Sequence, residues 1–163
     1  MSDSLSTGTL GPVYEVHDRA LVNRFLLRYH YMHRGVPGWR CALTLRDREN
    51  ELLIRGVIVI GTPCSRVRMK DGYLEVTRLC AAGAPKNAAS YLLGHATRWA
   101  KQHGYRLVSY SDPSVGHTGT VYRAAGFHLE GKTKGGTWGN REGHLSDAQL
   151  PKDVWVWPPP EVA

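Results

Sequence analysis

The sequence predicts an α/β protein in which helices flank a twisted, mixed β-sheet. Apolar and polar residues alternate in several short segments, and apolar residues recur at helical spacing in two longer segments. These segments follow one another in the order β-α-ββ-β-α-β-α-β-β, which favours helices packed on a sheet. The 163 residues fit one domain, with 1–11 and 158–163 expected to be flexible tails.

The first half of the chain is expected to contain a strand, a helix and a hairpin. Residues 13–16 form the strand. Asp18 can cap the first turn of the helix, which should end near His30 before a segment rich in Gly and Pro. The apolar stripe of this helix consists of Val22, Phe25, Leu26 and Tyr29. A polar turn then joins the alternating segments 41–45 and 53–61 into a hairpin.

The second half centres on a strand, a loop of small residues, a long helix and another strand. Residues 62–72 are expected to be a loop, 74–82 a strand and 87–103 the helix, which Gly104 ends. The start of a helix that follows a strand is a common phosphate site in α/β proteins. The remaining elements are a strand at 105–110, a short helix at 118–125 and strands at 128–132 and 154–157.

The composition predicts a basic, cytoplasmic protein. Lys and Arg number 21 against 14 Asp and Glu, so the net charge is +7, which favours nucleic acid, an anionic cofactor or both as partners. No apolar run is long enough for a membrane span, and the start of the chain lacks the features of a secretion signal. Cys41, Cys64 and Cys80 lie far apart, which predicts free thiols and neither a disulfide framework nor a zinc site.

Two parts of the chain resemble the donor half of GNAT acetyltransferases. The strand LEVTRL at 74–79 and the helix start PKNAAS at 85–90 resemble their acetyl-CoA-binding segment, and VYRAAGF at 121–127 resembles the segment that closes their donor site. The loop lacks the usual R-x-x-G-x-G/A pattern but still offers backbone N–H groups and a hydroxyl. The resemblance implies that an acyl donor such as acetyl-CoA, or an aminoacyl donor, is held by Lys86, Asn87, Ala88, Ala89 and Ser90.

A narrower resemblance is to the Mom-type adenine-modification proteins of phages. SYSDP at 109–113 and GHTGTVY at 116–122 are similar to one stretch of that family, and HYMHR at 30–34 is similar to a segment near its start. The resemblance implies a GNAT-like fold and the addition of a carbamoylmethyl-type group (methylcarbamoylation) to the exocyclic amine of adenine in DNA. Such a phage or prophage protein protects DNA from the nucleases of its bacterial host.

Four residues are candidates for the chemistry of transfer. The resemblance gives Tyr122 the role of protonating the departing thiolate, although Tyr122 also fits a core aromatic residue. Asp112 follows an apolar strand, where it either accepts a proton from the amine or only stabilises the turn before Pro113. Arg78 interrupts an apolar strand, so it binds either an anion or a structural carboxylate. His30 is a candidate base or substrate contact.

Other residues are candidates for binding a metal or DNA. His30 and His33 are three residues apart and, with Asp112, match the ligand set of an iron site, although such a pair is also common as a structural or exposed feature. An enzyme acting on adenine in double-stranded DNA must flip the base, and Trp39 or Trp138 can stack on it. The candidate DNA and substrate contacts are Ser109, Ser111, His117, Arg66, Arg68 and Trp138, with Lys70, Lys132, Lys134 and Arg141 as further basic residues.

Three functions from different classes remain open at this point. The first is a DNA adenine-modifying transferase, and the second is a GNAT enzyme that acetylates a small amine or a protein. The third is a non-catalytic nucleic-acid-binding module, in which case the basic loops matter and Tyr122 and Asp112 do not. The sequence also leaves the oligomeric state open, with a homodimer as one option.

Overall fold

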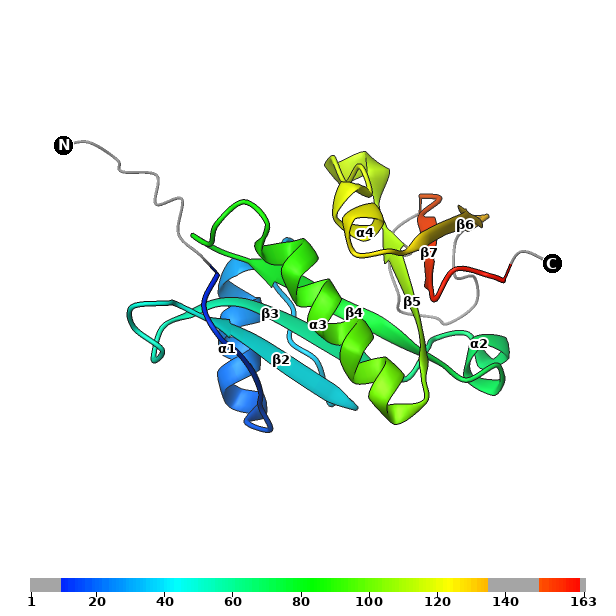
Figure 1. Cartoon of the computed structure of the whole chain (residues 1–163). Helices are drawn as coiled ribbons and strands as arrows, with labels where there is room; N and C mark the ends of the chain where they lie inside the picture. Colours follow the sequence, from blue (N-terminus) through cyan, green and yellow to red (C-terminus); the bar gives the residue numbers. More distant parts are fainter. Residues whose placement is uncertain (1–9, 135–149, 162–163) are drawn as a thin grey trace, which may run out of the picture.

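The computed structural model describes residues 10–134 and 150–161, which form a seven-stranded sheet with helices on both faces (Figure 1). The strand order is β1-β2-β3-β4-β5-β7-β6, and only the β4–β5 pair is parallel. The strands are β1 (Val13–Glu15), β2 (Cys41–Arg46), β3 (Ile54–Gly61), β4 (Tyr73–Ala81), β5 (Arg106–Ser111), β6 (His128–Lys132) and β7 (Asp153–Trp157). The helices are α1 (Arg19–Tyr29), α2 (Arg66–Lys70), α3 (Ala88–His103) and α4 (Thr120–Ala124), with a 3-10 turn at Pro113–Val115.

Helix α1 covers one face of the sheet. Its N-terminus is capped as expected, because the Asp18 carboxylate accepts a hydrogen bond from the amide of Leu21 at 3.1 Å. Three members of the predicted stripe are buried against β2, β3 and β4: Val22, Phe25 and Leu26. The expectation for Tyr29 was wrong, since its side chain is 47% exposed. Tyr29 lies in the last turn, where the helix passes beyond the core residues of the sheet.

Helix α3 covers the opposite face and builds the larger core. Its buried apolar side chains are Ala88, Leu92, Leu93, Ala96 and Ala100, and they pack in one cluster with residues of β2, β3, β4 and β5. Gly104 ends the helix in the left-handed conformation, with φ of 76°, as the sequence predicted. Among residues 10–134 and 150–161, no helix combines the length and apolar character needed to cross a membrane.

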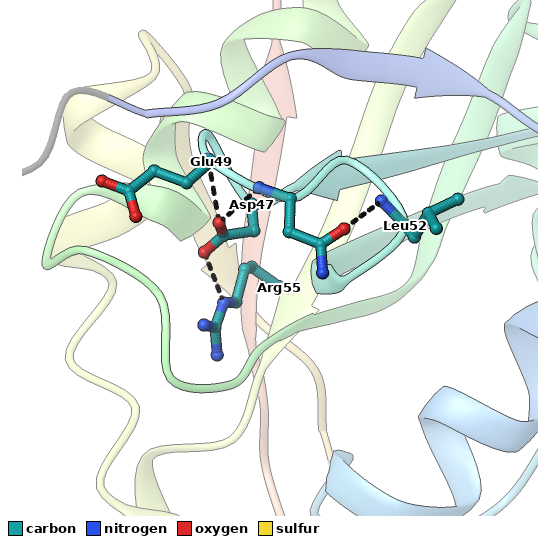
Figure 2. A network of polar contacts seen from close by, with 5 residues as sticks. Asp47, Glu49, Leu52 and Arg55 are labelled. Atoms are coloured by element: carbon teal, nitrogen blue, oxygen red, sulfur yellow. Dashed lines mark hydrogen bonds and ion pairs between the residues drawn. The ribbon is translucent and has the colours of Figure 1, made fainter.

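The hairpin of β2 and β3 is closed by a polar turn centred on Asp47 (Figure 2). Its carboxylate accepts hydrogen bonds from the amides of Glu49 and Asn50, each at 3.0 Å, and pairs with Arg55 at 3.0 Å. The hydrogen bond from the Asn50 amide is the main reason why the pKa of Asp47 is lowered, and the contacts with Arg55 and the Glu49 amide lower it further. The turn therefore holds the expected hairpin in register through side-chain capping of its backbone.

The segment expected to be a loop, residues 62–72, contains the short helix α2. Ser65 caps it by accepting a hydrogen bond from the amide of Arg68 at 3.4 Å. The Arg68 guanidinium forms a two-pronged ion pair with Glu130 of β6 and lies 5.1 Å from the ring centroid of Tyr73. These tertiary contacts fix a helix of only five residues, which local sequence periodicity cannot indicate.

Candidate active site

A cavity opens where the parallel strands β4 and β5 separate. Their register pairs Tyr73–Val76 with Arg106–Ser109, and both strands continue beyond the last pair. A bulge in the β3–β4 pairing lies at the same level, because Val59 pairs with Arg78 whereas Ile60 pairs with Val76. The resulting cavity has a volume of about 330 Å³. The two splayed strands therefore place side chains from both edges around one space.

Several of the residues singled out in the sequence meet in this cavity. They come from the segment after α1, from β4, α3 and β5, from the loop before α4 and from α4 itself. The predicted residues that line it are His30, Arg78, Ala89, Ser109, His117 and Tyr122. The separation of these positions in the sequence, from 30 to 122, means that the cavity is a product of the tertiary fold.

Tyr122 forms the inner wall of the cavity. Its side chain is buried, stacks on Trp155 with ring centroids 5.4 Å apart, and shares a hydrogen bond of 2.9 Å with the Ser109 hydroxyl. Burial raises the pKa of the Tyr122 phenol, so the group keeps its proton at neutral pH. A protonated phenol that faces a cavity is suited to give a proton to a leaving group.

Gly119 and Trp155 set the position of that wall. Gly119 has a φ of 78°, and a Cβ at this position would collide with the six-membered ring of Trp155. The Trp155 indole N–H donates to the Ser111 hydroxyl at 2.9 Å. Ser111 is thereby used in packing and does not line the cavity, whereas Ser109 does. Local sequence patterns assign no role to Trp155, because the side chains that it contacts, such as Tyr122 and Ser111, lie far away in the sequence.

Arg78 brings a positive charge into the cavity wall. One of its terminal nitrogens donates to the backbone oxygen of Thr77 at 2.7 Å, while its Nε atom is buried without a partner among the described residues. None of the ion pairs within residues 10–134 and 150–161 involves Arg78. A partly buried guanidinium with unused donors is suited to bind an anion or a developing negative charge.

His30 lies at the C-terminal cap of α1, 4% exposed, beside the ring of Tyr31. Its Nδ1 atom is 3.2 Å from the amide nitrogen of Met32. Burial, with further contributions from Arg78, His117 and other positive groups, lowers the pKa of His30 to about 4. A histidine with this pKa is neutral at physiological pH and accepts a proton only weakly. His30 is therefore better suited to contact the substrate than to act as a general base.

The depressed pKa of His30 has a consequence for stability. Between about pH 4 and pH 6.5 the unfolded chain binds a proton at this side chain and the folded chain does not. Stability at this site is therefore lost as the pH falls through that window. We expect the free energy of unfolding, measured in urea, to fall less between pH 6.5 and pH 4 in His30→Gln than in the wild-type protein. Equal slopes for the two proteins would contradict this assignment.

Asp112 lies next to the cavity but is not one of its lining residues. Its carboxylate accepts hydrogen bonds from the Ser114 amide at 2.9 Å and the Ser114 hydroxyl at 2.5 Å. The hydroxyl contact is the main reason why its pKa is lowered. This geometry favours the alternative of a structural turn residue, and the catalytic role of Asp112 stays a prediction.

The iron hypothesis does not fit the described residues. No three His, Cys, Asp or Glu side chains within residues 10–134 and 150–161 come together as metal ligands. Nδ1 of His30 accepts from a backbone amide, and Nδ1 of His33 lies 2.9 Å from the backbone oxygen of Leu27. The Nδ1 atoms of both histidines are therefore engaged with the backbone around the end of α1.

The predicted donor loop, residues 86–90, lies between two hollows. Ala89 lines the main cavity, whereas Asn87 and Ser90 line a more open hollow of about 580 Å³ between α3 and α4. Lys86 is exposed, and Ala88 is buried in the core, so only the backbone of Ala88 remains for a ligand. The Ser90 hydroxyl donates to the backbone oxygen of Asn87 at 3.1 Å. Residues of the predicted donor loop thus line both hollows at the start of α3.

The basic candidates divide into exposed and engaged residues. Arg66 and Lys70 of α2 are exposed, and so is Lys134, whereas Lys132 is exposed but pairs with the Asp153 carboxylate at 3.9 Å. Arg68 differs from the expectation, because it pairs with Glu130 within the chain. Trp39 is half-buried and packs against the core under α1. Trp138 and Arg141 lie outside the described residues.

The structure adds residues that the sequence analysis left without a role. Tyr31 lines the cavity and meets the ring of His117 edge-on at 5.2 Å, and Tyr110 lines the opposite side. Burial raises the pKa of both phenols. Their positions were detectable in principle, because both stand inside the segments that carry the narrower resemblance, HYMHR and SYSDP.

Comparison with known proteins gives a family and a fold. The model of the Mom protein family matches residues 13–147. No curated protein matches the sequence. The fold is similar to a Bacillus subtilis acetyltransferase in complex with CoA, with 12% identity, 91% of this chain and 97% of that chain covered and a TM-score of 0.56.

Two further solved structures have the same fold. One is yncA from Salmonella typhimurium with its cofactor acetyl-CoA, at 12% identity, coverage of 96% and 97%, and a TM-score of 0.64. The other is the ribosomal-protein-S18-alanine N-acetyltransferase from Escherichia coli, at 10% identity, coverage of 89% and 91%, and a TM-score of 0.60. These likenesses confirm the predicted GNAT-like fold.

Proposed function

This chain belongs to the Mom protein family, and from that premise we propose that it is a transferase that adds a carbamoylmethyl-type group to the exocyclic amine of adenine in DNA. The modified adenine would protect phage DNA from the restriction nucleases of a bacterial host. The observation that carries the proposal is the cavity between β4 and β5, where Arg78, Ser109 and Tyr122 surround one space. Ala89 at the start of α3 and His30 after α1 both line this cavity, so a donor held at α3 and a base beside His30 can meet there.

The transfer needs one bond to form, one bond to break and one proton to move. The amine nitrogen forms a bond to a carbon of the activated donor as the bond from that carbon to the leaving group breaks. The amine gives up one proton, and the leaving group takes up one. Tyr122 is suited to supply the second proton, because burial keeps its phenol protonated. Arg78 is suited to stabilise negative charge on the donor.

The donor we propose is an anionic compound related to an acyl or aminoacyl group, with the leaving group on the methylene carbon that joins the amine. Acetyl-CoA itself would transfer an acetyl group and form an amide, which is the product of the second candidate function below. The start of α3 supports an anion site, because helix N-termini present backbone N–H groups to negative charge. Lys86 adds an exposed cation and Ser90 a hydroxyl at the same place. The acceptor is double-stranded DNA with the adenine flipped into the cavity. Arg66, Lys70 and Lys132 are the exposed cations proposed to contact its phosphates.

A second candidate is N-acetyl transfer to a small amine or a protein, which the acetyltransferase fold favours. The two functions differ in what the purified protein binds and modifies. An N-acetyltransferase of this kind would bind acetyl-CoA tightly and ignore DNA. A DNA-modifying enzyme would bind duplex DNA with an affinity that falls steeply as the salt concentration rises.

Mass spectrometry of nucleosides from cells that express the protein tests the proposed function. We expect a new mass on deoxyadenosine with the wild-type protein, and a reduction of at least about 100-fold for Arg78→Gln, because the charge that faces the donor is lost. Arg48→Gln is the matched control, since Arg48 is exposed in the β2–β3 turn. Unmodified deoxyadenosine under good expression of folded wild-type protein would contradict the proposed function.

A further inference from the structure

The hydrogen bonding of His30 fixes the position of its proton. Nδ1 accepts a hydrogen bond from the backbone amide of Met32 at 3.2 Å, and a backbone N–H can only donate. Nδ1 must therefore be unprotonated. A neutral imidazole carries one proton, so the proton is on Nε2. The ring presents a donor, and no acceptor, on the side away from Met32.

That donor is directed to the cavity. His30 lines the cavity although only 4% of its surface is exposed, and Nδ1 is turned back to its own chain. Within residues 10–134 and 150–161, Nε2 forms no hydrogen bond. The phenol of Tyr31 lies against the ring of His30, and the groups around it that carry or can take up a positive charge are Arg78 from β4, His117 from the loop before α4, and His33. Since all three disfavour a positive imidazole, the neutral tautomer persists across the physiological pH range.

We propose that the Nε2–H of His30 donates a hydrogen bond to N1 of the flipped adenine and so helps to select the base. This inference rests on the proposed function. A flipped base offers its Watson–Crick edge to the pocket, and in adenine that edge places the acceptor N1 beside the reactive amine. Guanine and thymine carry an N–H at the corresponding ring position, which would face a fixed donor. Cytosine has the same acceptor–amine pair as adenine, so His30 by itself does not reject it.

A single-atom change in the base tests the contact. The probe is a DNA duplex with one adenine opposite an abasic site, compared with the same duplex carrying 1-deazaadenine, which keeps the amine and lacks the ring nitrogen. We expect the full-length wild-type protein to bind the 1-deazaadenine duplex about 3- to 10-fold more weakly in fluorescence anisotropy, as loss of one neutral hydrogen bond predicts. A 7-deazaadenine duplex is the control and should bind as tightly as the adenine duplex.

Variants of His30 identify the donor. His30→Gln places an amide N–H close to the position of Nε2 and should retain the preference for adenine over 1-deazaadenine. His30→Ala should bind the two duplexes equally. Equal binding of both duplexes by the wild-type protein, or a preference that survives in His30→Ala, overturns the inference. The wild-type comparison needs no variant, so a folding defect in His30→Ala leaves the test decisive.

Failure of this inference is distinguishable from failure of the proposed function. If deoxyadenosine is modified in cells and 1-deazaadenine binds as tightly as adenine, only the role of His30 is wrong. If deoxyadenosine stays unmodified and the wild-type protein binds adenine no better than thymine at the unpaired position, the proposed function itself is wrong. A third result, in which His30→Ala abolishes modification without altering base preference, would assign the Nε2–H to the donor molecule and overturn the inference.

Discussion

Replacement of Tyr122 by Phe should lower the modification of deoxyadenosine by about 100-fold or more, the range typical of a lost general acid. The change removes one oxygen atom and keeps the ring that stacks on Trp155 and contacts Phe127. The fold should therefore persist. The main structural change is that the Ser109 hydroxyl loses its hydrogen-bond partner. The measurement is the modified fraction of deoxyadenosine in cells with limiting expression, together with a thermal unfolding curve of the purified variant.

Ser109→Ala tests whether Tyr122 acts through its own proton or only through its hydrogen bond to Ser109. This variant breaks the same 2.9 Å contact but leaves the phenol of Tyr122 in the cavity. We expect only a several-fold loss of modification, because an alanine at Ser109 removes orientation and not the acid itself. Tyr14→Phe is a remote control, since Tyr14 bonds to Glu51 at an exposed position. If Tyr122→Phe and Ser109→Ala lose the same amount of deoxyadenosine modification, the two side chains act through packing. Tyr122 would then be a core aromatic residue and not a general acid.

Replacement of Gly119 by Ala should lower the free energy of unfolding by about 2–5 kcal/mol, the sum of backbone strain and overpacking. Gly119 has a φ of 78°, and its added Cβ meets the ring of Trp155. Trp155 is 1% exposed and is held on its other sides by Ser111 and Tyr122, so the indole has no space to move into. Urea unfolding followed by tryptophan fluorescence measures the effect.

Gly72→Ala is the matched control for the backbone contribution. Gly72 has nearly the same φ, 79°, and a Cβ there would have no atom within 4 Å. This variant should lose only about 1 kcal/mol, the cost of a left-handed conformation without a collision. A Gly119→Ala protein as stable as Gly72→Ala would show that the Trp155 side chain yields, and that Gly119 does not set the cavity wall. If Gly119→Ala folds, its modification activity should fall with the displaced Tyr122.

The sequence predicted the elements well because each depends on neighbouring residues. Helical spacing, the Asp18 cap and the Gly104 stop are local signals, and α1 and α3 begin and end within one or two residues of the expected positions. The exception, α2, has five residues and gains its stability from the ion pair of Arg68 with Glu130, 62 positions away. A local pattern cannot contain that contact.

The amino-acid sequence by itself determined the mixed α/β fold, the family and the residue types of the site, because apolar periodicity and short motifs are written in consecutive positions. Only the tertiary structure decided which of those residues share a cavity. The separation of β4 from β5 beyond Val76 and Ser109 places Arg78 and Tyr122 together and leaves Asp112 in a turn. The tertiary structure also places the proton of His30 on Nε2, because the amide of Met32 donates a hydrogen bond to Nδ1. Such relations arise from strand pairing and packing between distant segments, which one-dimensional patterns do not encode.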